Sequence, residues 1–350
     1  MAPFKSSLAR SGKKLLGFFN QSDLSLRGAT QSTRLPPPGP FSATGGQKFT
    51  PGDGFHYHVI ISSTPSPTKN IVATGGAGSV ANCSILIVGG GGGGASLQGP
   101  GAAAGAGGGA GGMVYATGIT LPFQATNPIT IGAGGAISPP AYSQTGTNGG
   151  DTTIALGGSL TLTGKGGGGG AMYSVDGNDG GSGGGASYDG ANGGATTQAP
   201  ANPSPFQPYC YGTAGGNGHP SPDVYNGAGG GGAGGAGQNA PSTGGGLGGP
   251  AKSTVFTSPL FPGMDSTFLT AIGPNGNFAQ GGGGGTYSPN VGSPSGYAGA
   301  GGGGGGGPAT DLSPNSEKAG VDNTGSGGGK GDGGDGIVIL KYPIGAKYSE

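Results

Sequence analysis

Few residues of this 350-residue chain have the types and spacing that catalysis or metal binding requires. His56 and His58 stand two apart in the run FHYHVIIS, so on a strand they would share one face and could supply two metal ligands. The sequence has one other histidine, His219, and its two cysteines, Cys83 and Cys210, are far apart. A histidine pair of this kind is more often part of a half-exposed strand, and we therefore expect no metal site.

The sequence GSGGGKGD around Lys330 has the glycines of a phosphate-binding loop. Such a loop ends in Gly-Lys followed by Ser or Thr and begins a helix, and neither feature is found here. Asp332 and Asp335 precede the last apolar run, where turn chemistry accounts for them and calcium binding is the alternative. No Ser/His/Asp set stands out, so we expect no cofactor and a protein that is not an enzyme.

The charge and cysteine content exclude several classes of protein. The formal net charge is +0, from 14 basic and 14 acidic residues, which gives no electrostatic reason to bind nucleic acid or an anionic membrane. No apolar run reaches 18 residues, so we expect no membrane insertion. Two cysteines are too few for a disulfide framework, and two buried thiols are favoured over one bridge.

Glycine dominates the chain, with 94 of 350 residues, whereas about 7% is usual. The glycines form blocks, which makes the chain either a flexible linker or a structure that packs backbone against backbone. Polyproline II helices without Cβ atoms can stand close enough to exchange lateral hydrogen bonds. Strongly apolar runs recur between the blocks, which favours ordered rods of this kind, called polyglycine II. We expect alanine only where its methyl group points out of the stack.

Short β-strands are expected to frame these rods, giving an all-β fold. The strongest apolar runs are 55–62, 83–88, 113–121 and 337–342, and 128–131 is shorter. Residues 152–156 and 159–163 flank Gly157 and Gly158, which predicts a hairpin. Weaker runs lie at 255–256 and 267–272.

The first 50 residues differ from the remainder, and we expect two regions, one of residues 1–50 and one of residues 51–350. Six of the 14 basic residues lie before position 35, and a PPPGP break at 36–40 predicts an extended linker. The N-terminal region is interpreted as a short helical or extended anchor, with a floppy basic tail as the alternative. The residues that would make this anchor are Phe4, Leu8, Leu15, Leu16, Phe19, Arg27 and Arg34.

Tyrosines gather in the loops between the later glycine blocks, together with Asn, Asp and Ser. Tyr, Ser, Gly and Asn on a rigid frame are typical of adaptable recognition surfaces. The alternative is that these tyrosines cap the ends of the rods and cover the bundle. The candidate receptor-binding residues are Tyr173, Tyr188, Tyr209, Tyr211, Tyr225, Tyr287 and Tyr297.

The pattern CSILIVGGGGGG, GGGAGGMVYATGITLP, NPITIGAGG, GGDTTIALGGSLTLTGKGGGGG and GGDGIVILKYP resembles the glycine-rich domains of tailed-phage virion proteins. These include tail-fibre and adhesin proteins, and the type is frequent in marine and cyanobacterial phages. The resemblance covers roughly 55–343 and implies a bundle of polyglycine II helices on a β-framework. A similar pattern occurs in the glycine-rich domain of the anaplastic-lymphoma-kinase type of receptor, but the sequence has no kinase and no spanning helix.

The resemblance implies a virion protein located at a tail fibre or on the head surface. Its N-terminus would bind other virion proteins, its loops would bind a glycan or protein of the host surface, and it would be a homo-oligomer, expected as a trimer. The alternative is a capsid or tail decoration protein that binds no receptor.

Overall fold

The computed structural model describes residues 41–64, 69–74, 79–95, 105–122, 125–137, 145–158, 160–198, 209–253, 276–285 and 319–345. Within these ranges the chain is all-β and contains no α-helix, as the sequence predicts. These residues belong to one compact unit, Pro40–Glu350. The anchor residues of 1–34 and the weak strands expected at 255–256 and 267–272 lie outside the described residues.

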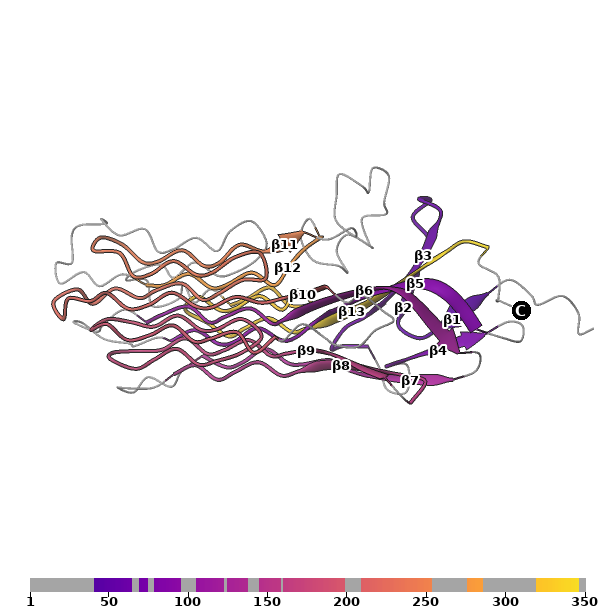
Figure 1. Cartoon of the computed structure of the whole chain (residues 1–350), viewed down its shortest axis with the longest axis horizontal. Coiled ribbons are helices and arrows are strands. Elements are labelled where there is room, and N and C mark those ends of the chain that lie inside the picture. Colours follow the sequence, from indigo (N-terminus) through magenta and orange to yellow (C-terminus); the bar gives the residue numbers. More distant parts are fainter. Residues whose placement is uncertain are drawn as a thin grey trace, which may run out of the picture. The chain divides into compact units, whose positions relative to one another are not determined.

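Two antiparallel sheets and one short pair of strands make up the framework (Figure 1). The six-stranded sheet has the order β10 (Tyr209–Tyr211), β6 (Met113–Pro122), β5 (Ser79–Val88), β13 (Ile337–Pro343), β3 (Phe55–Ile60) and β2 (Gln47–Phe49). The five-stranded sheet has the order β1 (Ser42–Thr44), β4 (Asn70–Thr74), β7 (Thr126–Thr130), β8 (Thr152–Leu156) and β9 (Leu160–Gly164). The pair consists of β11 (Lys252–Ser253) and β12 (Asn277–Phe278).

The predicted strands are confirmed wherever the structure describes them, with shifts at their ends. β5 begins four residues earlier than the predicted start at Cys83, and β7 begins two residues earlier than Pro128. The predicted hairpin joins β8 to β9, and its Gly157 and Gly158 have φ of 56° and 74°, as a two-residue turn between twisted strands requires.

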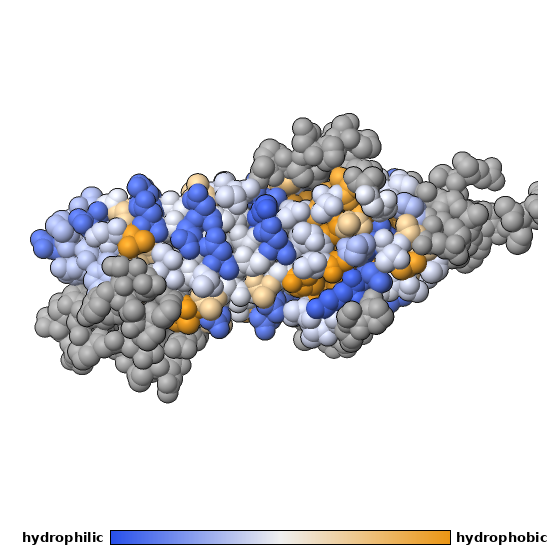
Figure 2. Space-filling model, turned by 90° about the horizontal axis from the view of Figure 1, so that it is seen from below, coloured by the Kyte–Doolittle hydropathy of each residue, from blue (hydrophilic) through white to orange (hydrophobic). Residues whose placement is uncertain are grey.

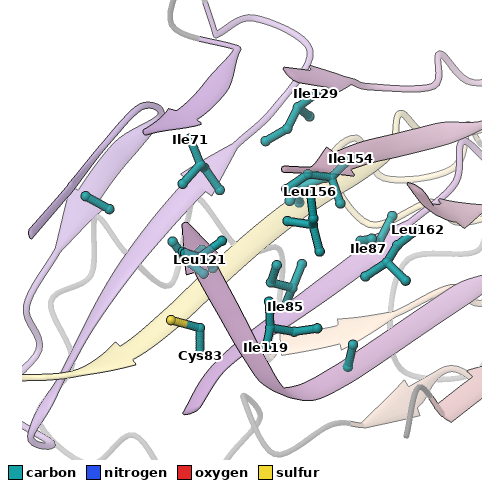
Figure 3. Packing of buried hydrophobic residues seen from close by; sticks show 14 of the residues in the cluster. Ile71, Cys83, Ile85, Ile87, Ile119, Leu121, Ile129, Ile154, Leu156 and Leu162 are labelled. Carbon is teal, nitrogen blue, oxygen red and sulfur yellow. The ribbon is translucent and has the colours of Figure 1, made fainter. Parts of the chain in front are cut away.

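Side chains from both sheets meet in one hydrophobic core (Figure 3). Ile85 and Ile87 of β5 and Ile119 of β6 face Ile154 of β8 and Leu162 of β9, and all five are at most 1% exposed. The two sheets therefore form a sandwich around this core.

The opposite face of the six-stranded sheet is also covered. Leu86 and Val88 alternate with Ile85 and Ile87 along β5 and pack in a second cluster, which includes Phe278 of β12 and two alanines of glycine segments. Burial on both faces explains why 85–88 of β5 and 337–340 of β13 are continuously apolar, a pattern usual in strands covered on both sides.

Glycine-rich segments run side by side away from the strands (Figure 1), and we call them the glycine bundle. The segment 89–95 shows how they pair. Its successive N–H groups donate to three different neighbours in turn, and each neighbour is met again three residues later. The bonds, all of 2.8 to 3.0 Å, run from Gly89, Gly92 and Ala95 to 105–112, from Gly90 and Gly93 to 145–151, and from Gly91 and Gly94 to 331–336. Three residues per turn is the period of polyglycine II.

The carbonyl groups of 89–95 complete its surroundings. They accept hydrogen bonds from three further segments, 165–171, 131–137 and 325–329, so this segment is surrounded by six hydrogen-bonded neighbours. Because each glycine faces a neighbouring backbone, a Cβ atom built on Gly92 would come closer than 3.0 Å to the Gly168 carbonyl. The predicted polyglycine II arrangement thus describes these segments.

The register of the strands continues unbroken into the glycine bundle. Val88 of β5 lies opposite Met113 of β6, and the next residue, Gly89, donates to Gly112. The pairs β13 with β5, β7 with β8, β8 with β9 and β11 with β12 are continued in the same way. The strands therefore fix which glycines of neighbouring segments are hydrogen-bonded to each other.

Several alanines of the glycine segments are fully buried, so their methyl groups do not face solvent. Alanines that are fully buried within glycine segments are Ala106, Ala110, Ala171, Ala186 and Ala228. Ala110 belongs to the second hydrophobic cluster, where its methyl group packs with Met113 and Phe278. An alanine is thus accepted inside the bundle where the sheet or another side chain leaves room for it.

Candidate functional site at the turns of the glycine bundle

Three described turns come together at the end of the bundle opposite the strands. Segment 165–171 follows β9 away from the sheet and ends at the turn 172–176. Segment 181–187 runs parallel to it and ends at 188–190. Segment 212–218 follows β10 in the same direction and ends at 219–225. We call this region the turn end.

Each of these turns contributes one tyrosine to a cluster. The ring centroids of Tyr173 and Tyr188 are 5.7 Å apart, with an angle of 71° between the ring planes. The centroids of Tyr188 and Tyr225 are 4.7 Å apart at 64°. Edge-to-face pairs of this kind are favoured by the ring quadrupoles. All three residues are partly exposed.

Hydrogen bonds lock the turns around these rings. Ser174 Oγ donates to Asp189 Oδ2 at 3.1 Å, which joins the first turn to the second. The Gly190 N–H donates to the His219 carbonyl at 2.9 Å, which joins the second to the third. The Ser221 N–H donates to His219 Nδ1 at 3.0 Å, so this nitrogen carries no proton. A neutral His219 ring therefore carries its proton on Nε2.

Tyr173 has an unusual backbone conformation, with φ of 55°. A bulky residue with positive φ is a conformational outlier, and glycine would adopt this conformation at little cost. The chain contains 94 glycines, yet a tyrosine stands here. Asp189 also has positive φ, at 61°, but it precedes Gly190 in an Asp-Gly hairpin turn, where that conformation is ordinary. Strain at Tyr173 points to a role for its side chain.

The other candidate tyrosines are not part of this cluster. Tyr209 and Tyr211 lie on β10 at the strand end, where Tyr209 is 50% exposed and the Tyr211 ring lies 4.7 Å from Lys252 Nζ. Tyr287 and Tyr297 lie outside the described residues. Tyr173, Tyr188 and Tyr225 lie at segment ends, as the capping interpretation predicts, and they are also partly exposed.

His56 and His58 both contact groups of the protein itself. His58 is 2% exposed, and its ring nitrogens contact the Gly45 carbonyl at 2.7 Å and the Tyr342 hydroxyl at 3.2 Å. Burial lowers the pKa of His58 to about 4, with a smaller contribution from the Lys48 charge. His56 contacts Thr50 Oγ1 at 2.7 Å and is partly exposed. Among the described residues, no group of three or more His, Cys, Asp or Glu side chains could hold a metal ion.

Asp332 and Asp335 accept hydrogen bonds from a neighbouring glycine segment. Asp332 Oδ1 accepts from the Ile137 N–H at 2.6 Å, and Asp335 Oδ1 accepts from the Gly134 N–H at 2.9 Å. Donors and acceptors are both three residues apart, so these carboxylates take the place of backbone carbonyls.

The same arrangement recurs at two other edges of the bundle. Side chains of Asn148 and Asp151 accept from the N–H groups of Gly169 and Gly166, and those of Asp176 and Asp179 accept from Asn192 and Ala195. We call these three pairs, which comprise five carboxylates and the amide of Asn148, the carboxyl clasps. On the face shown in Figure 2, hydrophilic residues form separate bands across the glycine bundle. The interpretation of Asp332 and Asp335 as turn residues missed this role, although the spacing in NGGD, DGND and DGGD carries the signal.

Cys83 and Cys210 are thiols and do not form a disulfide. Cys83 is fully buried on β5, and burial raises its pKa to about 12. Cys210 on β10 is only half-buried, so the expectation of two buried thiols holds for Cys83 alone.

The chain matches the model of the glycine-rich domain family over residues 64–343 and belongs to that family. A search of curated proteins gave no match. No helix among the described residues is both long and apolar enough to cross a membrane.

Proposed function

We propose that this chain is a non-enzymatic virion protein of a tailed phage, a tail-fibre or adhesin component that binds the host surface through its turn end. The observation that carries the proposal is the convergence of Tyr173, Tyr188 and Tyr225 from three separate turns at one end of a hydrogen-bonded bundle. Loops on rigid scaffolds are the usual place for binding residues. The resemblance of the strand-and-glycine pattern to phage virion proteins supplies the setting.

A rigid support matters for such a role because ordering a surface before binding removes much of the entropic cost of association. The three turns are held by segments that are bonded to each other on several sides, and the bundle is continuous with the sandwich. The turns can differ in sequence without changing the segments below them. As a virion component the chain would act as a homo-oligomer, expected as a trimer, bound to other virion proteins through its N-terminus.

Immunogold labelling of virions that carry the chain, with an antibody to the turns 172–176, 188–190 and 219–225, tests the location. Label at the tail or at fibre tips is the expected result. Label spread over the head would overturn the adhesin role in favour of the decoration role, and no label on any virion would overturn both.

Adsorption to the host tests recognition. Virions in which Tyr173, Tyr188 and Tyr225 are all replaced by alanine should adsorb at least about tenfold more slowly, since the loss of clustered aromatic anchors removes most of a binding surface. The matched control is Tyr209→Ala, an exposed tyrosine at the strand end. Equal adsorption of the triple variant and the control would refute binding through the turn end.

A further inference from the structure

The turn end has a composition that selects among classes of ligand. From 166 to 251 the sequence contains no Lys and no Arg, whereas four aspartates lie there, Asp176, Asp179, Asp189 and Asp223. Asp176, Asp189 and Asp223 belong to the three turns or adjoin their tyrosines, and all three are exposed. The three described turns thus carry carboxylates and no Lys or Arg, and such turns repel phosphate, sulfate and carboxylate groups.

The same surface has the aromatic residues of a protein interface, but its three described turns contain no Arg and no exposed Met. Such interfaces have an apolar centre in which aromatic residues, Met and Arg are enriched. Met172 is fully buried and so contributes no surface, and arginine is missing from this stretch of the sequence. Of the large hydrophobic residues that are exposed in the described ranges of the chain, none lies in the three turns.

The remaining features match an uncharged carbohydrate. The C–H groups of a sugar ring carry slight positive charge and suit the negative face of an aromatic ring. The hydroxyl groups of a sugar need acceptors such as carboxylates and donors such as an imidazole N–H. Both kinds of group surround the tyrosines, in Asp189, whose position is fixed by Ser174, and in the His219 ring, whose Nδ1 is already occupied.

We infer that the tyrosine cluster is a binding site for an uncharged glycan, with Tyr173, Tyr188 and Tyr225 as the surface for sugar rings and Asp189 and His219 as hydrogen-bonding partners of hydroxyl groups. The inference rests on the proposed function and specifies its ligand. The strained backbone of Tyr173 is an independent observation in its favour, because a glycine at that position would satisfy the turn but supply no ring.

Binding of the purified full chain to a panel of oligosaccharides tests the inference. The panel contains uncharged oligomers of glucose, galactose, mannose, rhamnose and N-acetylglucosamine, each with a sulfated counterpart. The chain contains no tryptophan and 12 tyrosines, so tyrosine fluorescence reports binding, and the variants below assign it to the cluster. We expect at least one uncharged oligomer to bind in preference to its sulfated form. Its affinity should change less than about twofold between about 50 and about 500 mM salt, because no charge pair is formed.

Variants locate the site on the chain. Tyr188→Ala should weaken binding at least about tenfold, since the central ring contacts both others. Tyr188→Phe, which keeps the ring, should retain binding within about threefold, and so should the control Tyr209→Ala at the strand end. Thermal unfolding of each variant shows whether a loss of binding reflects a loss of fold. Tyr188→Phe is the variant expected to keep both the fold and the binding, because it keeps the ring.

Three outcomes would overturn the inference. They are no binding of any uncharged oligomer, preference for a sulfated form, or equal binding by Tyr188→Ala and the wild-type chain. If no glycan binds while the triple tyrosine variant still impairs adsorption, the ligand is a host protein and only this inference fails. If the glycan binds while adsorption is unchanged, the site exists and the proposed role in host recognition fails.

Discussion

The strands β5 and β6 differ from the glycine segments that continue them in what fills the space between neighbouring chains. In the sheet, hydrogen bonds lie in one plane, and the third dimension is filled by side chains such as Ile85 and Leu86. In the bundle, backbone groups point in every direction around segment 89–95, and neighbouring backbones fill the space themselves. A protein interior can therefore be filled by backbone alone, provided that side chains are nearly excluded from it.

The two regions also differ in what fixes the register between neighbouring segments. A strand that slips by one residue turns its apolar side chains to the wrong face, so side chains fix its register. A glycine segment has no side chains that could fix its register, because Gly92 and Gly93 are chemically identical to their neighbours. The unbroken register from Val88 opposite Met113 to Gly89 opposite Gly112 shows that the sandwich supplies the information that the bundle lacks.

The largest effect is expected for a side chain added inside the bundle. Gly92→Val should lower the free energy of unfolding by about 4 kcal/mol, because its Cβ would collide with the Gly168 carbonyl and separate segments that exchange hydrogen bonds. Chemical denaturation measures the change. The control is Gly190→Ala, which meets no atom within 4 Å and should cost about 1 kcal/mol for its left-handed conformation. Equal costs for the two variants would show that the bundle is loosely packed.

A smaller effect, confined to the strand region, is expected from pH. The pKa of His58 is lowered to about 4 when the chain is folded, against 6.5 for the unfolded residue, so the unfolded state binds the proton first as pH falls. Stability should therefore decline between about pH 6.5 and pH 4, by up to about 3 kcal/mol. The nearby charges of Lys48 and His56 oppose protonation of His58.

The measurement is a series of denaturation curves across this pH range for the wild-type chain and for His58→Gln. The variant should be less stable at neutral pH and should lose most of the pH dependence. Hydrogen exchange should show early opening near β3 and β13 at low pH, since His58 contacts Tyr342. An unchanged slope in the variant would mean that other groups carry the acid sensitivity.

The smallest effect is expected at the carboxyl clasps. Asp335→Ala removes the acceptor of the Gly134 N–H at the edge of the bundle and should cost about 1 kcal/mol. Asp335→Asn keeps a side-chain oxygen and should cost less than half as much, as the native Asn148 at another clasp suggests. Denaturation of both variants provides the comparison, and a cost for asparagine equal to that for alanine would show that charge rather than geometry matters there.

The sequence predicted the elements of the fold that have a local signature. Apolar runs such as Cys83–Val88 and the turn at Gly157–Gly158 have physical causes within a few residues, namely burial and positive φ. β1, β2, β4 and β10 escaped prediction because they are short and mixed in polarity, and they form only through pairing with partners far along the chain. The burial of Ala110 escaped prediction because its cluster includes residues of the sheet and of β12 that lie far along the chain.

For the candidate site, residue types could be predicted but their grouping could not. Tyr173, Tyr188 and Tyr225 are separated by 14 or more residues, and which turns become neighbours depends on the order in which segments pack in the bundle. Nothing in the sequence around Tyr209 distinguishes it from Tyr225, although the two lie at opposite ends of their segments. The three-residue spacing of the carboxyl clasps is visible in the sequence. It indicates paired hydrogen bonds only once the glycine segments are known to have three residues per turn.

That period has a consequence for how the length of such a bundle can change. One inserted glycine would rotate every later peptide group of its segment by about 120°, so that each N–H would face a different neighbour. Three inserted residues restore all the directions and lengthen the segment by one turn, about 9 Å, but only when the opposing segments grow too. Segments of such a bundle can therefore change length only in steps of three residues, because any other insertion would misdirect every hydrogen bond that follows it.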